Sequence, residues 1–485
     1  MRIKRTLFFW IILASFGFAW TLALPFEGTL LYALLERDSF LPSSLVFELV
    51  LAVCAGLASS GFWIKNRHRA LGCIRLSLIF CLGVTLFAFV SSPWLRPLLW
   101  LGCFFMGISI ASLAFYIVRL ETPVQRYRVV ADILIYGNVW MIASDMLTVN
   151  LSIEAGLIVC ALALCVGLYG TRCLTQSVAE SPAPKATQVT DSSVLAPLAF
   201  LTVFITIICI NSGLMYQVLV PAFSGVKAFA SFYWAIPYVV AIGIMRRYPT
   251  LLSPKQALFA ALSMNGLAFL TFGILDRSLP SYLVVNTLML FACGIYDLFW
   301  WSVLACLSCK HRNPALVFGI GLGGNVLGVL IGGIIGHSIF NIQSEMSFLL
   351  YAAPLSLFVI CTLMTLLNPL HKLLRTHVAD SPFLQDDLEK EIIKETIKET
   401  ILVPVFSDAE HSALPDDLTE QEKRIAALIH KGRTYDMIAE ELFISKNTVK
   451  FHIKNIYGKC GVKNKAEFIK FLKTAGGKTD QEAGK

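Results

Sequence analysis

The chain has 485 residues, of which 56% are hydrophobic and 15% are charged, and its formal net charge is +8 at pH 7. Soluble domains carry about 25% charged residues, so this composition excludes an ordinary soluble protein and predicts a chain embedded in a membrane over most of its length. Charges are sparse as far as Asn368 and dense from His371 to Lys485, which predicts a lipid-embedded part followed by an aqueous part. All 13 cysteines except Cys460 lie in or beside apolar segments, as small buried hydrophobes do, and so do not indicate a disulfide framework.

A helix that crosses a bilayer needs roughly 20 apolar residues. About twelve such stretches follow one another, and a polar linker at residues 171–194 divides them into two sets of about six each. The predicted membrane domain therefore spans residues 1–370. The stretches run near Thr6–Leu24, Ser43–Ile64, Ala70–Val90, Leu98–Val118, Val129–Val149, Ser152–Gly170, Leu195–Leu219, Ala228–Met245, Gln256–Leu275, Ser281–Ala305, Ala315–Phe340 and Ser347–Leu367.

Lysine and arginine are concentrated in alternate loops between these stretches. In membrane proteins the cytoplasmic loops carry the excess of basic residues. The less basic loops hold only Arg37, Arg96, Lys227 and Arg277, whereas both chain ends and the central linker fall on the basic side. The bias predicts a multi-pass protein of the bacterial cytoplasmic (inner) membrane with both termini in the cytoplasm. The basic segment Arg2–Arg5 before an apolar run also resembles a signal peptide, but the length of that run and the spans after it favour a membrane helix.

Residues 371–415 are predicted to form a basic juxtamembrane segment, a helix and a linker. Leu384–Leu402 has apolar residues at helical spacing, which predicts an amphipathic helix that ends before Pro404. Fewer than three heptads fit, so dimerisation as a coiled coil stays open as an alternative to a plain connecting helix. The last residues, 476–485, are predicted to be a flexible tail.

Residues 416–475 carry four short helical patterns with clear start and stop signals. The second and third patterns are separated by the three residues Phe443–Ser445, and Ser445 is suited to cap the third. Two helices joined by so short a turn predict a DNA-binding helix-turn-helix. Glycines follow the first and third helices, and capping side chains precede three of the starts: Thr419 with Glu422, Thr434, and Asn464 with Glu467.

The predicted third helix carries a stripe of lysines. Lys446, Lys450 and Lys454 recur every four residues and therefore share one face. From Lys446 to Lys465 there are six lysines and no acidic residue. DNA presents one phosphate charge per about 1.7 Å of axis, which such a face neutralises with release of counterions. A solvated lysine face is the alternative, but the stripe, the turn and the caps together favour DNA binding. The opposite face is apolar: Val449, Ile453 and Ile456.

Sequence motifs in this region resemble the LuxR-type DNA-binding domain. They are L-T-E-Q-E at Leu418–Glu422, I-A-E-E-L at Ile438–Leu442 and I-S-K-N-T-V-K-F-H-I-K-N-I at Ile444–Ile456, and the similarity continues through Tyr457–Glu467. The resemblance covers about the last 60 residues. It implies an all-α, four-helix domain that forms a homodimer on double-stranded DNA through its last helix and contacts the major groove with its third.

The resemblance also implies DNA contacts for six residues of the third helix. Base-edge contacts are expected from Lys450, Phe451 and Lys454, and phosphate or positioning contacts from Lys446, Thr448 and His452. The sequence departs from the usual pattern with Cys460 in place of leucine and Lys465 in place of arginine. Phe451 is bulkier than the usual aliphatic residue, which leaves the base preference open.

The two sets of spans resemble the architecture of the major facilitator transporters, whose binding sites lie at the bilayer midplane between the halves. The resemblance rests on topology, and the basic loop KNRHR at residues 65–69 lacks the aspartate typical of that family. A charge within a span costs at least about 2.5–3.5 kcal/mol, so such residues indicate function. Asp297 is the first candidate for ligand binding, followed by Asn138 with Trp140 and by Asp145, with structural hydrogen bonding as the alternative.

Other residues in the spans carry two interpretations each. Arg75, Glu48 and Asp132 lie nearer span ends, where they snorkel or form pairs. Four aromatic residues are candidates either for lining a pocket or for packing: Tyr233, Trp234, Trp300 and Trp301.

Two motif matches are better explained without a ligand. Gly319, Gly321 and Gly324 fit G-x-G-x-x-G, but they lie inside a long apolar helix with no strand before them. Glycines recur every four residues from Gly324 to Gly336, which predicts close helix packing. Cys306–Cys309 forms C-x-x-C without a second ligand pair nearby, so no metal site is predicted.

These features together predict a membrane-anchored one-component transcriptional regulator. Its helix-turn-helix would bind DNA under the control of an unknown small-molecule or membrane signal sensed in the bilayer. The alternative is a major-facilitator-like small-molecule transporter with a regulatory DNA-binding tail. No acid–base cluster or complete metal-ligand set indicates an enzyme, and no cofactor is predicted.

Overall fold

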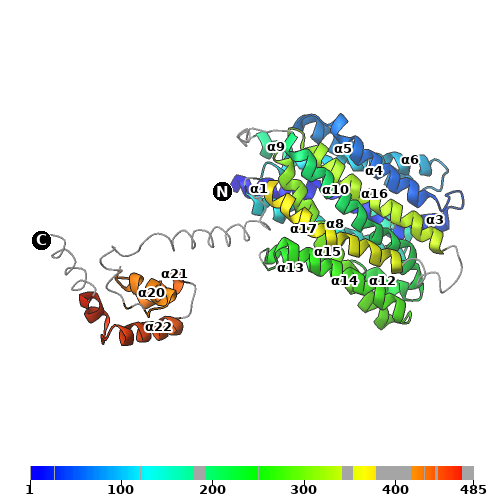
Figure 1. The fold of residues 1–485 in the computed structure, drawn as a ribbon. Coiled ribbons are helices and arrows are strands. Elements are labelled where there is room, and N and C mark those ends of the chain that lie inside the picture. Colours follow the sequence, from blue (N-terminus) through cyan, green and yellow to red (C-terminus); the bar gives the residue numbers. More distant parts are fainter. Residues whose placement is uncertain are drawn as a thin grey trace. The chain divides into compact units, whose positions relative to one another are not determined.

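The computed structural model describes residues 2–26, 28–120, 122–179, 192–249, 251–340, 353–377, 415, 417–430, 432–442 and 446–471. The chain forms two compact units, Met1–Leu388 and Glu389–Lys485. The described residues of both are organised as helices without strands, as Figure 1 shows. The predicted all-α fold class, a helix bundle followed by a small helical domain, is confirmed.

Eleven helices in the described part of the membrane unit are long and apolar enough to cross a bilayer. They follow the predicted order on both sides of the central linker. Short helices adjoin them: α3 (Thr29–Arg37), α7 (Ala114–Ile117), the π-helical η1 (Met215–Leu219), α11 (Val220–Ala222) and η2 (Ser224–Val226). The spanning elements are α4 (Leu45–Trp63), α5 (Arg67–Phe87), α6 (Leu95–Ser112), α8 (Pro123–Asn150), α9 (Ile153–Ala179), α10 (Ser192–Leu214), α12 (Lys227–Tyr233) with α13 (Ile236–Arg247), α14 (Pro254–Ile274), α15 (Leu279–Ser308), α16 (Pro314–Phe340) and α17 (Ala353–His377).

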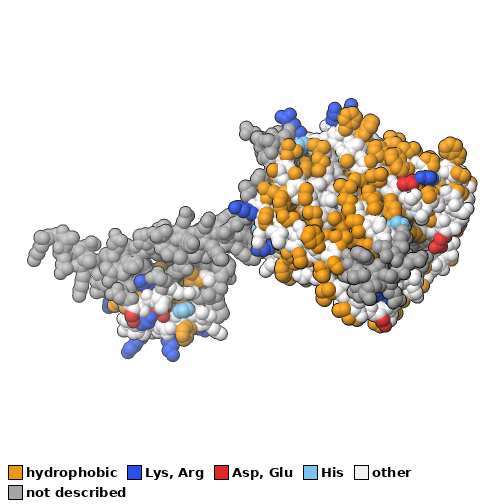
Figure 2. All heavy atoms as spheres, turned by 45° about the vertical axis from the view of Figure 1, so that its right-hand side comes forward, with side chains coloured by type: hydrophobic (Ala, Val, Ile, Leu, Met, Phe, Trp, Pro, Cys, Tyr) orange, Lys and Arg blue, Asp and Glu red, His pale blue; other side chains and the backbone are white. Residues whose placement is uncertain are grey.

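Large hydrophobic side chains lie on the outside of this unit as well as in its interior. Phe62, Ile274 and Phe358 are among the exposed ones. Figure 2 shows hydrophobic side chains spread over the visible face of the helices, with charged side chains mainly near the margins of that face. Water solvates such an extended apolar surface poorly, whereas lipid solvates it well. The unit is therefore a membrane-spanning helix bundle.

The first predicted span, Thr6–Leu24, is two helices and not one. α1 (Arg2–Ala14) ends at a turn over Ser15, and α2 (Gly17–Ala23) follows. The Ser15 hydroxyl donates to the Ile12 carbonyl at 2.7 Å, a local side-chain bond of the kind that bends helices. Hydropathy alone misses this break because the apolar pattern is continuous across it.

Two helices run further than predicted. α9 continues into the predicted central linker, where Arg75 of α5 donates hydrogen bonds to the hydroxyl and the carbonyl of Thr171, at 3.2 and 3.0 Å. α17 likewise continues to His377, through basic residues that were expected to follow the last span. The rest of the central linker, the helix predicted at Leu384–Leu402 and the tail at residues 476–485 lie outside the described residues.

The glycine-bearing face of α16 packs against α10. A Cβ atom added at Gly328 or Gly332 would overlap the backbone carbonyl of Thr206 or Ile210 on α10. The close-packing interpretation of the glycine repeat is therefore confirmed. The glycines that complete the G-x-G-x-x-G match are also packing positions, facing side chains and backbone of α4 and α15.

Candidate nucleic-acid interface and membrane cavity

The C-terminal unit is a small helical domain with a core of its own. Its described helices are α20 (Glu420–His430), α21 (Tyr435–Glu441), α22 (Lys446–Lys459) and a last helix at residues 465–471. The four predicted helices are present, while the turn between the second and third lies outside the described residues. Apolar side chains from all four meet in one cluster: Ile425, Ile429, Ile438, Val449, Ile453, Ile456 and Phe468.

The helix starts and ends of this domain have the predicted capping geometry. The Glu422 amide donates to the Thr419 hydroxyl at 3.3 Å, and the Thr419 amide donates to the Glu422 carboxylate at 3.0 Å, which is a capping box. At the last helix the Glu467 amide donates to the Asn464 side chain at 2.9 Å. The two glycines predicted to end helices have φ of +83° and +66°, a left-handed conformation that favours glycine.

The helix α22 has the two faces expected from its sequence. Its apolar face is buried in the core. The opposite side is exposed and carries four of the six predicted DNA contacts: Lys446, Lys450, Phe451 and Lys454. Thr448 and His452 are half-buried. Since the Phe451 side chain is 62% exposed, the cationic face also presents an aromatic ring.

The last helix is fixed to α22 through Phe468. Its buried ring lies 5.8 Å from the ring of Tyr457. Lys465, which stands where LuxR-type domains commonly have arginine, donates to the carbonyl of Arg433 at 2.9 Å. Lysine at position 465 is therefore still a cationic hydrogen-bond donor, and its bond joins the loop before α21 to the last helix.

The membrane unit contains a cavity of about 600 Å³ that is lined from both halves of the bundle. Asn138, Asp145 and Asp297, three of the four predicted ligand-binding residues, line it. Trp140, the fourth, is not among the lining residues, and its ring packs 5.9 Å from that of Phe16. The cavity is of the size that holds a small organic molecule, since ligand pockets are about 300–1,000 Å³.

Three polar residues of the cavity have hydrogen-bond partners within the protein. Thr29 of α3 donates its hydroxyl to the Asp145 carboxylate at 2.5 Å. Tyr238 of α13 donates its hydroxyl to the Asp297 carboxylate at 2.6 Å. The Asn138 amide donates to the Leu134 carbonyl of its own helix at 2.9 Å, which gives this side chain a structural bond as well.

Aromatic side chains form much of the cavity wall. Trp234, Trp300 and Trp301 line it, whereas Tyr233 is not among the lining residues and shares a 2.8 Å hydrogen bond with Thr287. Sequence reasoning missed several lining residues, because no local pattern marks which side of a long apolar helix faces a cavity. They include Thr29, Tyr216, Tyr238 and Tyr296.

Comparison with known proteins identifies the C-terminal unit. Residues 416–472 match the family described as "Bacterial regulatory proteins, luxR family". The "Monoamine regulon transcriptional regulator" of Klebsiella aerogenes is 38% identical over 60 residues, which are 12% of this chain and 26% of that protein. The "Probable transcriptional regulatory protein SgaR" of Hyphomicrobium methylovorum is 45% identical over 51 residues, 10% of this chain and 24% of that protein. The matches thus span only about a quarter of the length of these relatives.

Solved structures resemble the membrane unit. The human organic anion transporter TETRAN aligns with a TM-score of 0.55 and 17% identity over 74% of this chain and 99% of that one. A bacterial homologue of the iron transporter ferroportin, in an outward-facing state, aligns with a TM-score of 0.52 and 16% identity over 77% of this chain and 100% of that one. At these identities the likeness shows the fold alone. The chain therefore joins a membrane-spanning bundle with the fold of the major facilitator transporters to a LuxR-type helix-turn-helix domain.

Proposed function

We propose that this protein is a membrane-anchored one-component transcriptional regulator, in which a signal sensed by the membrane bundle controls sequence-specific DNA binding by the C-terminal domain. The observation that carries the proposal is the exposed cationic face of α22, in a LuxR-type domain that shares one chain with a membrane bundle. Base-edge contacts are assigned to Lys450, Phe451 and Lys454, and phosphate or positioning contacts to Lys446, Thr448 and His452.

The proposal includes a topology and an oligomeric state. DNA is in the cytoplasm, so the C-terminal domain must be cytoplasmic, which agrees with the distribution of lysine and arginine among the loops. Binding as a homodimer through the last helix fits the exposed side of that helix, where Ala466, Glu467 and Lys470 lie. A dimer also doubles the number of base contacts and so raises specificity.

A mechanical connection from the cavity to the tail runs through two packed helices. Ile208 and Ser212 of α10 line the cavity. α10 packs against α17, which is the last described helix before the DNA-binding domain. A ligand that moves α10 would therefore move α17, and this movement is how we propose that occupancy of the cavity alters the tail.

Genome-wide crosslinking of the full-length protein to DNA tests whether it is a regulator that binds DNA through α22. The wild type is compared with the double variant Lys450→Ala, Lys454→Ala and with a control, Lys423→Ala, Arg433→Ala, which loses the same charge outside α22 and outside the last helix. We expect sharp peaks for the wild type and the control and none for the first variant. Peaks that persist without Lys450 and Lys454, or no peaks from abundant wild-type protein, would reject the assignment.

A second function, small-molecule transport with a regulatory tail, is favoured by the transporter fold and by the cavity between the halves. Uptake by vesicles that contain the protein would distinguish the two. Uptake that depends on the protein and is abolished by Asp297→Ala would support transport. A regulator that senses its ligand without transporting it shows no uptake.

A further inference from the structure

The cavity of the membrane unit is acidic. Three carboxylates, those of Glu36, Asp145 and Asp297, are among its described lining residues, which include no lysine and no arginine. The described lining also includes His337. The cavity therefore offers negative charge and hydrogen-bond acceptors to whatever occupies it.

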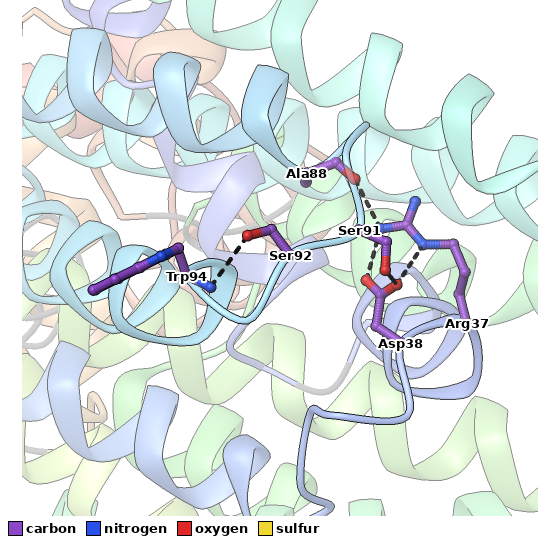
Figure 3. Close-up of polar contacts among 6 residues, drawn as sticks. All are labelled: Arg37, Asp38, Ala88, Ser91, Ser92 and Trp94. Atoms are coloured by element: carbon purple, nitrogen blue, oxygen red, sulfur yellow. Dashed lines mark hydrogen bonds and ion pairs between the residues drawn. The ribbon is translucent and has the colours of Figure 1, made fainter.

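Three carboxylates elsewhere in this unit form ion pairs with arginine. Figure 3 shows Arg37 and Ser91 directed at the Asp38 carboxylate, with an Arg37–Asp38 separation of 2.7 Å. Arg246 and Asp132 form an ion pair at 2.5 Å, and the carboxylate of Glu48 is held by an arginine of α6 at 2.7 Å. Pairing of this kind is what makes a carboxylate tolerable in a low-dielectric environment.

The two aspartates deep in the cavity lack such a partner. Within the described residues, Asp145 accepts its side-chain bond from Thr29 and Asp297 from Tyr238, and neither forms an ion pair with a protein cation. A hydroxyl supplies a hydrogen bond but no positive charge. Asp145 is only 4% exposed, so solvent screens it poorly. The missing charge can be supplied by a ligand.

Aromatic rings line the same cavity as these carboxylates. Trp300 stacks in parallel with Tyr296 at 6.0 Å, and Trp301 contacts Phe18 of α2 edge-on at 5.5 Å. All four residues line the cavity. The faces of tryptophan and tyrosine rings attract cations, by about 2 kcal/mol or more where water is excluded. Acidic groups among aromatic walls are the chemistry that selects an organic cation over an anion or a neutral molecule.

We infer that the cavity is a binding site for an organic cation with an apolar or aromatic body, whose positive charge lies between Asp145 and Asp297. Asp145 is on α8 of the first half, and Asp297 is on α15 of the second half. A cation held by both would pull the halves together. The inference extends the proposed function by naming the chemical class of the signal, and the role as a signal rests on that function.

Binding of benzyltrimethylammonium to the purified full-length protein in lipid nanodiscs tests the site. The charge of this probe does not depend on pH. Phenylmethanesulfonate has a similar shape and the opposite charge, and benzyl alcohol is the neutral comparison. We expect measurable binding of the cation at millimolar concentration, at least about tenfold tighter than that of either comparison molecule.

Variants that change only charge locate the site. Asp145→Asn and Asp297→Asn keep an oxygen to accept the Thr29 or Tyr238 hydroxyl, so we expect each to stay folded and to bind the cation about tenfold more weakly or worse. Glu48→Gln, which removes a carboxylate outside the cavity lining, should bind as the wild type does. Equal binding of the three probes, no binding of the cation, or retention of its affinity in both aspartate variants would overturn the inference.

The outcome is separable from that of the proposed function because no DNA is present in the binding measurement. If the protein binds the cation but gives no DNA peaks, the cation site is supported and the function as a regulator is rejected. If it gives peaks that depend on Lys450 and Lys454 but does not bind the cation, the function as a regulator is supported and the cation site is rejected.

Discussion

Lys459 at the end of α22 lies 2.8 Å from the carboxylate of Glu422 in the first turn of α20. Lys459 also donates to the carbonyl of Asp417 at 2.7 Å. Glu422 is the same residue that closes the capping box of α20 with Thr419. One buried carboxylate therefore starts the first helix of the DNA-binding domain and fixes it to the end of the DNA-contacting helix.

This arrangement predicts acid sensitivity of the domain. The hydrogen bond from Lys459, with those from Thr419, lowers the pKa of Glu422 from 4.5 to about 2. A carboxyl group whose pKa is depressed by folding stabilises the folded state above its unfolded pKa, and this contribution is lost as the pH falls from about 4.5 toward 2. Denaturant unfolding of a fragment of residues 405–485 between pH 7 and pH 3 should show this loss.

The substitution Lys459→Met measures how much the Lys459–Glu422 pair contributes to the stability of the domain. Removing the cation leaves a carboxylate that is 4% exposed without its main partner, and we expect a loss of roughly 1–3 kcal/mol in unfolding free energy at pH 7. The difference from the wild type should shrink toward pH 3. Lys446→Met is the matched control, because it breaks an ion pair with Asp436 at 2.8 Å in which both side chains are more than half exposed. Such a pair contributes little. Equal losses from the two substitutions would contradict the argument.

Lys450 and Lys446 should have different effects on DNA binding. A lysine at a base edge contributes about 1–3 kcal/mol of discrimination, so Lys450→Ala should relax sequence preference at one position. A phosphate contact carries no sequence information, so Lys446→Ala should weaken binding to all sequences and lower the salt slope by about 1. Both effects are measured by titrating the protein with a DNA site identified by genome-wide crosslinking and with random DNA, at several salt concentrations. Equal losses on the two DNAs for Lys450→Ala would rule out its role as a base contact.

The features that the sequence predicts correctly depend on local patterns. The two faces of α22 follow from lysines four residues apart, and the capping box follows from Thr419 and Glu422 three residues apart. Asn138 and Asp145 are seven residues apart on α8 and both line the cavity, as helical periodicity requires. Trp140 is two residues from Asn138, which places it on another face, so the same rule would have excluded it.

The features that the sequence does not predict depend on how helices are rotated and paired. Tyr238 reaches Asp297 across 59 residues of chain, and Thr29 reaches Asp145 across 116. No spacing rule connects such residues, and the long helices that carry Asp145 and Asp297 have apolar patterns that give no preferred face. Likewise, Arg75 donates to the extended part of α9 at Thr171, 96 residues away.

The packing of α16 on α10 predicts a contrast between two glycines of one helix. A Cβ atom at Gly332 would overlap the carbonyl of Ile210, whereas at Gly323 it would make an ordinary contact with Leu57 at 3.9 Å. Gly332→Ala should therefore force the helices apart, with a cost of about 1–3 kcal/mol or more, and lower the melting temperature in nanodiscs. Gly323→Ala should leave it unchanged or raise it. Similar melting temperatures for the two variants would show that this close contact does not stabilise the bundle.

The pair of Asp132 on α8 and Arg246 on α13 predicts a coupling between the two halves of the bundle. Asp132 is 7% exposed, and next to it the Tyr127 hydroxyl donates to the Met245 carbonyl at 2.9 Å. Arg246→Met leaves a buried carboxylate without its cation and should lower the melting temperature in nanodiscs more than Asp132→Asn does. The double variant removes both charges and should recover part of the loss, because no unpaired carboxylate is left. If the two decreases in melting temperature simply add in the double variant, the two side chains act independently. The connection between the halves then comes from the contacts of α8 with α13 and α15.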